Sequence, residues 1–140
     1  MIEMKSLSLE EAKAAIEAML QAASEQPGQP VGMAVVDSRG ELISFARMDG
    51  ANSFNQKMAI RKAYTAAVVG VDTGLFGQFL PSLNMNITDF GEIDISIVPG
   101  GVCVRTADGA TILGGIGVSG RIAQEDEALS KVGMEAALKQ

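Results

Sequence analysis

Apolar positions along the chain recur with the helical period in three long segments. Ser8 and Glu11 form a capping box ahead of the first helix, and Pro27 and Pro30 follow its end. The segments FNQKMAIRKAYTAAVVG and RIAQEDEALSKVGMEAALKQ predict a second helix and a last one. The stripe of the first helix that we expect to face the core is Leu9, Ala12, Ile16, Met19, Leu20 and Ala23.

Five short segments between these helices read as strands. Four of them flank turns at residues 38–40 and 107–109, and so predict two antiparallel hairpins: VGMAVVD with ELISFARM, and VCVRT with ATILGGIGV. The fifth, EIDISIV, alternates strictly, with Ile93, Ile95 and Ile97 on one face. Their order predicts an α+β fold in which a five-stranded antiparallel sheet is flanked by helices, as one domain over residues 1–140.

The last predicted strand ends in GGIGVSG, which contains the dinucleotide-binding spelling Gly115-x-Gly117-x-x-Gly120. That motif also needs a second parallel strand after the helix, and no such strand follows before Gln140. We therefore interpret the segment as a strand-to-helix corner of an antiparallel protein. Its in-strand glycines indicate a bulge, or the close approach of another backbone or a ligand.

Composition and charge narrow the class of protein. Apolar residues make up 47% and charged residues 20% of the chain, as in folded soluble proteins. The net charge of −6 argues against nucleic acid and anionic membrane surfaces as partners. The N-terminal segment has acidic residues where a signal peptide would be basic, and no run of apolar residues is long enough to span a membrane. The sequence thus predicts a cytoplasmic protein.

Histidine is absent, and Cys103 is the single cysteine. This excludes metal sites built from histidine or from several cysteines, and nucleophiles activated by histidine. We predict no metal site. Cys103 lies in the middle of a predicted strand, where a small buried apolar side chain is the favoured interpretation.

Lys62 lies inside an apolar stripe of the second helix, together with Met58 and Thr65. Desolvation would lower the pKa of such a lysine and make it a candidate base, Schiff-base former or anion contact. The alternative is that its stem covers apolar surface while the ammonium group reaches solvent or a partner subunit. Met58 and Thr65 are candidate ligand contacts on the same stripe.

Arg47 and Asp49 would project to one face if the second strand continued through Asp49. Arg47 could then grip a carboxylate with two hydrogen bonds, and Asp49 could move a proton. The alternative is a turn or cap role for Asp49 and a solvent-exposed Arg47.

Glycines and an acidic residue near the last helix are further candidates. Gly100 and Gly101 interrupt the regular structure ahead of a strand. Ser119 and Gly120 precede a helix start that would suit a carboxylate. Asp126 shares a helix face with apolar residues, so we expect it to point inward, towards Arg47 or Lys62 of a partner subunit.

Four motifs in order make the chain similar to the GlcG/HbpS family of haem-degrading domains, which includes the C-terminal domain of PduO corrinoid adenosyltransferases. These motifs are VVDSRGELISFARMDGA, KAYTAA, PGGVCVRTADGATILGGIGVSG and QEDEAL. The resemblance implies a profilin-like fold with α/β/α layers that assembles into dimers or larger homo-oligomers. It also implies haem or another small ligand near the motif loops. Members are described as haem-binding, as haem-degrading or as accessory proteins. The resemblance therefore predicts the fold of this chain better than its activity.

The chain departs from the haem-binding pattern because it offers no histidine to iron. The remaining axial ligands are Cys103, Tyr64 and the methionines, which suit core positions as well. Haem therefore stays a possible cofactor with weak coordination. Three functions remain open: a protein that binds a tetrapyrrole or small organic ligand near a subunit interface; a cofactor-independent lyase or isomerase acting on an organic acid; and an accessory protein without a site.

Overall fold

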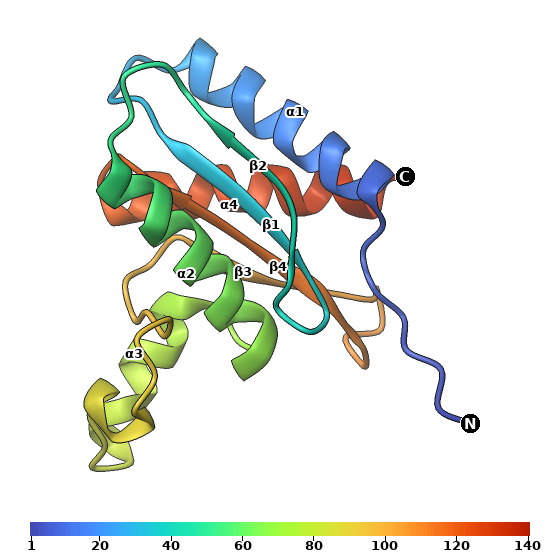
Figure 1. Cartoon of the computed structure of the whole chain (residues 1–140), viewed down its shortest axis with the longest axis vertical. Coiled ribbons are helices and arrows are strands. Elements are labelled where there is room, and N and C mark those ends of the chain that lie inside the picture. The colour runs from blue at the N-terminus through green and yellow to red at the C-terminus, as the bar shows by residue number, and fades with distance from the viewer.

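The computed structural model describes all 140 residues and shows helices on both faces of one antiparallel sheet (Figure 1). No helix is both long and apolar enough to cross a membrane. The helices are α1 (Leu9–Glu25), α2 (Ser53–Val69), α3 (Thr73–Ser82) and α4 (Ala123–Leu138), with a short 3₁₀ helix η1 (Ile87–Phe90). The strands are β1 (Gly32–Asp37), β2 (Leu42–Arg47), β3 (Gly101–Arg105) and β4 (Ile112–Ser119).

The sheet has the order β2-β1-β4-β3, and every neighbouring pair is antiparallel. Both predicted hairpins are confirmed, and β1 and β4 join them in the centre of the sheet. The larger core lies between the sheet and the pair α1 and α4, and includes Met19, Met33, Ile116 and Leu129. On the other face, α2 covers the sheet with a row of alanines, while α3 and η1 project away from it (Figure 1).

The glycines of β4 allow the backbone of α2 to lie directly on the strand. A Cβ atom at Gly115 would overlap the carbonyl oxygen of Ala63, and one at Gly117 would overlap that of Ala59. The sequence left three explanations for these glycines: a bulge, a nearby ligand or the close approach of another backbone. The structure shows the close approach of another backbone. The first two glycines of the dinucleotide-like spelling therefore serve the packing of a helix on a strand, while Gly120 lies against the backbone of Pro30 and Val31.

The prediction of a fifth strand is wrong, because residues 92–98 form an irregular segment. Thr65 Oγ1 accepts a hydrogen bond from Ser96 N at 2.9 Å, which ties the segment to α2. Ile95 is buried between helices, whereas Ile93 is 78% exposed, so the alternation does not describe a sheet face.

The outer edge of β3, where a fifth strand could pair, is already hydrogen-bonded to side chains. Gly101 N donates to Thr73 Oγ1 at 3.0 Å, and Cys103 N donates to Asp72 Oδ1 at 2.9 Å. Because these N–H groups are satisfied, β3 remains an edge strand that is protected against further pairing.

The capping box of α1 is confirmed in both directions between Ser8 and Glu11. The predicted stripe is right only in part, since Leu9 and Leu20 are exposed and Ala15 is buried. The far end of α1 has no basic residue of its own. Instead Arg121, from the segment between β4 and α4, donates to three carbonyl oxygens there, those of Ala23, Gln26 and Gln29.

Candidate functional site

A cleft of about 220 Å³ lies where the start of α2, the end of β4 and the start of α4 meet. These three ends come together on the left of Figure 1. The cleft is lined by Phe54, Asn55, Met58, Lys62, Val98, Ser119, Gly120, Arg121, Ala123 and Asp126.

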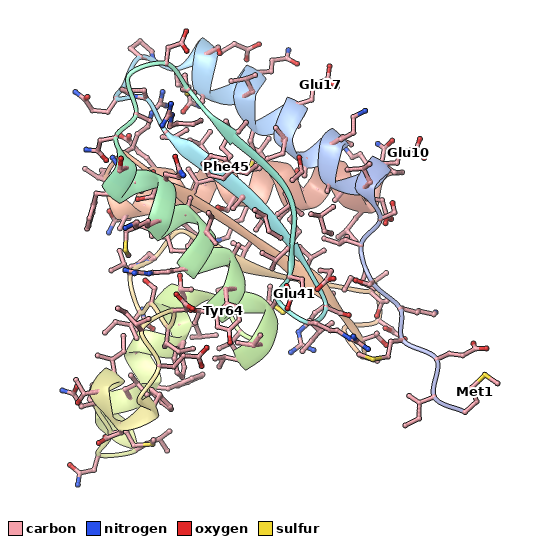
Figure 2. The ribbon with its side chains drawn as sticks, viewed as in Figure 1. Met1, Glu10, Glu17, Glu41, Phe45 and Tyr64 are labelled. Atoms are coloured by element: carbon pink, nitrogen blue, oxygen red, sulfur yellow. The ribbon has the colours of Figure 1, made fainter.

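A larger hollow of about 610 Å³ runs along the outer face of α1 and the C-terminal residue. It is lined mainly by exposed side chains, among them Glu10 and Glu17, which point away from the sheet (Figure 2). No buried polar group faces it. The cleft beside Lys62 is therefore the candidate site, because a buried charged pair forms its floor.

Lys62 and Asp126 form this pair, and each side chain is only 2% exposed. Lys62 Nζ lies 3.5 Å from Asp126 Oδ2 and donates a hydrogen bond to the carbonyl oxygen of Val118 at 3.0 Å. Asp126 Oδ1 accepts a hydrogen bond from Arg121 N at 3.0 Å. The prediction that Asp126 points inward is confirmed. The expected partner is corrected, because Asp126 meets Lys62 of its own chain.

Burial disfavours both charged forms. Desolvation lowers the pKa of Lys62, although the nearby Asp126 carboxylate opposes this shift. Desolvation likewise raises the pKa of Asp126, against the hydrogen bond from Arg121 N and the attraction of Lys62. Two groups whose pKa values move towards each other at hydrogen-bonding distance are suited to exchange a proton.

Gly100 and Gly101 make room for Lys62 but do not line the cleft. A Cβ atom at Gly100 would lie 2.7 Å from Lys62 Nζ, and this residue has a φ of +132°, which side chains rarely adopt. A Cβ atom at Gly101 would overlap the carbonyl oxygen of Lys62. Both glycines therefore support the lysine and its helix, and neither lines the cleft.

Hydrogen-bond donors are in excess on the walls of the cleft. Ser119 Oγ donates to Asn55 Oδ1 at 3.0 Å, which leaves the amide nitrogen of Asn55 without a partner in the chain. No side chain caps the start of α4, whose first residue, Ala123, is part of the lining. The first N–H groups of a helix have no acceptor within it.

Of the predicted ligand contacts, Met58, Ser119 and Gly120 line the cleft, and Thr65 does not. The hydroxyl of Thr65 instead holds residues 94 and 96.

Arg47 and Asp49 lie away from the cleft, contrary to the prediction. The strand β2 ends at Arg47, so Asp49 falls in the following turn, and β1 separates β2 from β4. Arg47 is exposed and donates to Gln56 Oε1 at 3.3 Å. The two residues that sequence reasoning paired therefore form no common site with Lys62.

Asn55 and Arg121 belong to the cleft but were not predicted. Asn55 precedes Met58 and Lys62 by three and seven residues on α2, so the helical period that singled out Lys62 could have found it. Arg121 has no comparable sequence signal, because its role depends on the end of α1 lying nearby.

The cleft offers haem iron one of the axial ligands named above, a methionine, and neither the cysteine nor the tyrosine. Met58 supplies the single sulfur atom of the lining. Cys103 is buried in β3, where desolvation raises the pKa of its thiol and keeps it protonated. Tyr64 is on the part of α2 that faces residue 92, and its hydroxyl donates to Glu92. None of the other axial ligands that the sequence offers reaches the cleft.

Solved structures with the same fold cover nearly the whole chain. ORFY from Klebsiella pneumoniae is 21% identical, with a TM-score of 0.86 over 98% of this chain and 94% of that one. A complex of PduOC with haem is 20% identical, with a TM-score of 0.83 and 94% of both chains covered. At these identities the likeness concerns the fold alone.

HbpS is more similar in sequence. A double mutant of HbpS from Streptomyces reticuli is 28% identical, with a TM-score of 0.85 over 96% of this chain and 89% of that one. None of the curated proteins is significantly similar to the chain. The family model described as haem-degrading protein HbpS-like matches residues 7–135. This match spans all four helices, apart from the last residues of α4, and the whole sheet, and the chain belongs to the HbpS-like family.

Proposed function

We propose that this protein binds a small organic ligand in the cleft between α2, β4 and α4, where Lys62 donates a hydrogen bond to an oxygen atom of the ligand. The observation that carries this proposal is the incomplete bonding of the Lys62 ammonium group. An ammonium group has three hydrogens, and the chain supplies two acceptors, Val118 O at 3.0 Å and Asp126 Oδ2 at 3.5 Å. The third hydrogen is free for a ligand.

The size of the cleft limits the ligand. Pockets for drug-sized ligands occupy roughly 300–1,000 Å³. The volume of about 220 Å³ lies below that range, so the whole of a haem macrocycle has no room beside Lys62. Membership of the HbpS-like family supports a ligand-binding role, while the residues of this cleft argue for a ligand without coordinated iron.

A thermal-shift screen of small organic acids, amides and ketones tests the proposal. We expect a ligand to raise the melting temperature of the wild-type protein and to have no effect on Lys62→Met, because the variant lacks the donor on the cleft floor. Lys57→Met is the matched control, since Lys57 is exposed on the same helix and lies outside the cleft. If Lys62→Met does not fold, Asn55→Ala removes a donor from the wall instead. Equal shifts in wild type and in these cleft variants would refute the site.

Haemin forms a second arm of the same screen, read by absorbance. Because the cleft has no thiolate, phenolate or imidazole, we expect the absorbance spectrum to show no band typical of haem iron that is ligated by one of these groups. Such a band in the wild-type protein, lost in Cys103→Ala or Tyr64→Phe, would show that haem is coordinated elsewhere in the chain. The homo-oligomers that the family resemblance implies also stay a prediction, which light scattering of the purified protein checks.

A cofactor-independent enzyme is the second candidate function. The observation that favours it is the buried pair, in which the pKa of Lys62 is lowered and that of Asp126 is raised. In such an enzyme Lys62 would accept a proton from a bound carbon acid, and Asp126 would stabilise the protonated lysine. Arg47 and Asp49 have no part in this proposal, because they lie away from the cleft.

Solvent exchange tests this second function. A ligand found in the screen should exchange its acidic C–H hydrogens with D₂O faster in the presence of wild-type protein than with Lys62→Met. Exchange at the buffer rate in the wild-type protein would leave ligand binding as the function.

A further inference from the structure

The cleft floor carries almost no net charge. Of the ten residues that line the cleft, three are charged: Lys62, Arg121 and Asp126. Lys62 and Asp126 compensate each other at 3.5 Å. The guanidinium group of Arg121 donates to carbonyl oxygens at the end of α1, which is the negative end of that helix, so its charge is directed away from the cleft.

A carboxylate would consequently find no free cation in the cleft. To approach Lys62 it would have to come close to the buried carboxylate of Asp126, and repulsion between like charges is strong where both are desolvated. Arg47, to which sequence reasoning assigned a carboxylate held by two hydrogen bonds, lies beyond β1. The start of α4 contributes a partial positive charge beside Ala123, but the cleft lacks a free cation that would balance the full charge of a carboxylate.

The free polar groups of the cleft are donors. They comprise the third hydrogen of Lys62, the amide nitrogen of Asn55 and the uncapped N–H groups at the start of α4. Both oxygens of Asp126 are engaged, one with Lys62 and the other with Arg121 N. A ligand that complements this arrangement offers a hydrogen-bond acceptor without a charge, as the carbonyl oxygen of an amide or a ketone does.

Apolar side chains surround this polar floor. Phe54 is 67% exposed and Val98 is 43% exposed, and Met58 and Ala123 complete the apolar part of the lining. A short hydrocarbon tail would cover these groups and remove apolar surface from water. Each methylene group buried in this way increases affinity about fourfold.

We propose that the cleft selects small uncharged amphipathic molecules, with a carbonyl group towards Lys62 and a short apolar tail towards Phe54 and Val98, over organic acid anions. This inference rests on the proposed ligand cleft and names the class of ligand that it takes.

Matched pairs of ligands test the selection of an uncharged head group. We would measure dissociation constants by ligand-observed NMR at pH 7.5 for amides from acetamide to hexanamide, for the carboxylates of equal chain length, and for succinate. We expect each amide to bind at least fivefold more tightly than its carboxylate, and succinate to bind most weakly. Affinity should rise about fourfold for each added methylene until the cleft is full.

Two variants separate the head group from the tail. Asp126→Asn leaves Lys62 uncompensated, so the carboxylates should gain at least tenfold relative to the amides. Phe54→Ala changes an exposed side chain, so it should fold, keep the preference for amides and lose part of the dependence on tail length. It keeps the tail prediction testable if Asp126→Asn does not fold.

The possible results distinguish a failure of the proposed selectivity from a failure of the proposed ligand cleft. Tighter binding of carboxylates or succinate than of amides by the wild-type protein would overturn the selectivity and leave the cleft in place. The same holds for an unchanged preference in folded Asp126→Asn, or for a tail dependence that Phe54→Ala does not alter. Absence of binding for every ligand in the series would overturn the proposed function and this inference with it.

Discussion

Lys62→Met should lower the free energy of unfolding by about 3–5 kcal/mol, because it leaves Asp126 buried without its counter-charge. Asp126 is only 2% exposed, and its remaining partners are backbone N–H groups, that of Arg121 at 3.0 Å and that of Gly120. Asp126→Leu should cost a similar amount, since it leaves an ammonium group in the same position. Urea denaturation followed by circular dichroism measures both variants.

The double variant Lys62→Met with Asp126→Leu should be far more stable than either single variant. Removing both charges avoids the desolvation that lowers the pKa of Lys62 and raises that of Asp126. Replacement of a whole buried pair by apolar residues is often neutral or stabilising by about 1–4 kcal/mol. A double variant no more stable than the single ones would show that the pair itself, rather than the desolvated charge, stabilises the fold.

The pH dependence of Lys62→Met has a definite sign. The folded-state pKa of Asp126 is raised by burial, so between its unfolded and folded pKa values the native state binds more protons than the unfolded state. Stability from this group is therefore present at low pH and is lost as the pH rises through the folded pKa. Without Lys62, which lowers that pKa, the window should extend to higher pH. Lys62→Met should thus be less destabilised at pH 5 than at pH 8, and the opposite order would contradict this account.

Gly117→Ala should destabilise the protein by about 3 kcal/mol or more, at the upper end of what overpacking costs. The added Cβ would overlap the carbonyl oxygen of Ala59 and lie 2.6 Å from the backbone nitrogen of Ala63. Because both atoms belong to the backbone of α2, no rotation of a side chain relieves the overlap, and the helix must move away from β4. Thermal and urea unfolding measure the loss.

Gly32→Ala is the matched control, because it also places a methyl group between the sheet and α2. The nearest atom to its Cβ would be the carbonyl oxygen of Asn55 at 3.4 Å, which is an ordinary contact. We expect a change below about 1 kcal/mol. Movement of α2 in Gly117→Ala should also displace Lys62 and reduce ligand-induced shifts. A stable Gly117→Ala protein with normal ligand response would contradict the close contact between α2 and β4.

Local patterns predicted the elements of this fold well. Both hairpins, the three long helices, the capping box at Ser8 and the burial of Cys103 follow from periodicity and turn residues, which act over a few neighbouring positions. The alternation of EIDISIV predicted a strand because side chains alternate in any extended segment. Whether that segment pairs depends on a neighbour, and the edge of β3 is occupied by Asp72 and Thr73.

The candidate site likewise has features that the sequence predicted and features that it did not. The stripe that contains Lys62 was visible in the sequence, as was the inward orientation of Asp126, because both follow from the position of a residue on its helix. Arg47 was misplaced because its strand ends two residues before Asp49, and because another strand separates it from β4.

The sequence by itself determined the helices, the hairpins, the absence of imidazole chemistry and the apolar stripe that contains Lys62, because each depends on local periodicity or on composition. Only the tertiary structure decided that Lys62 meets Asp126 of the same chain, that Arg121 points to α1, and that the glycines of β4 receive a helix backbone rather than a phosphate. These contacts join residues more than fifty positions apart. Their geometry is set by how the helices pack on the sheet, which no local pattern encodes.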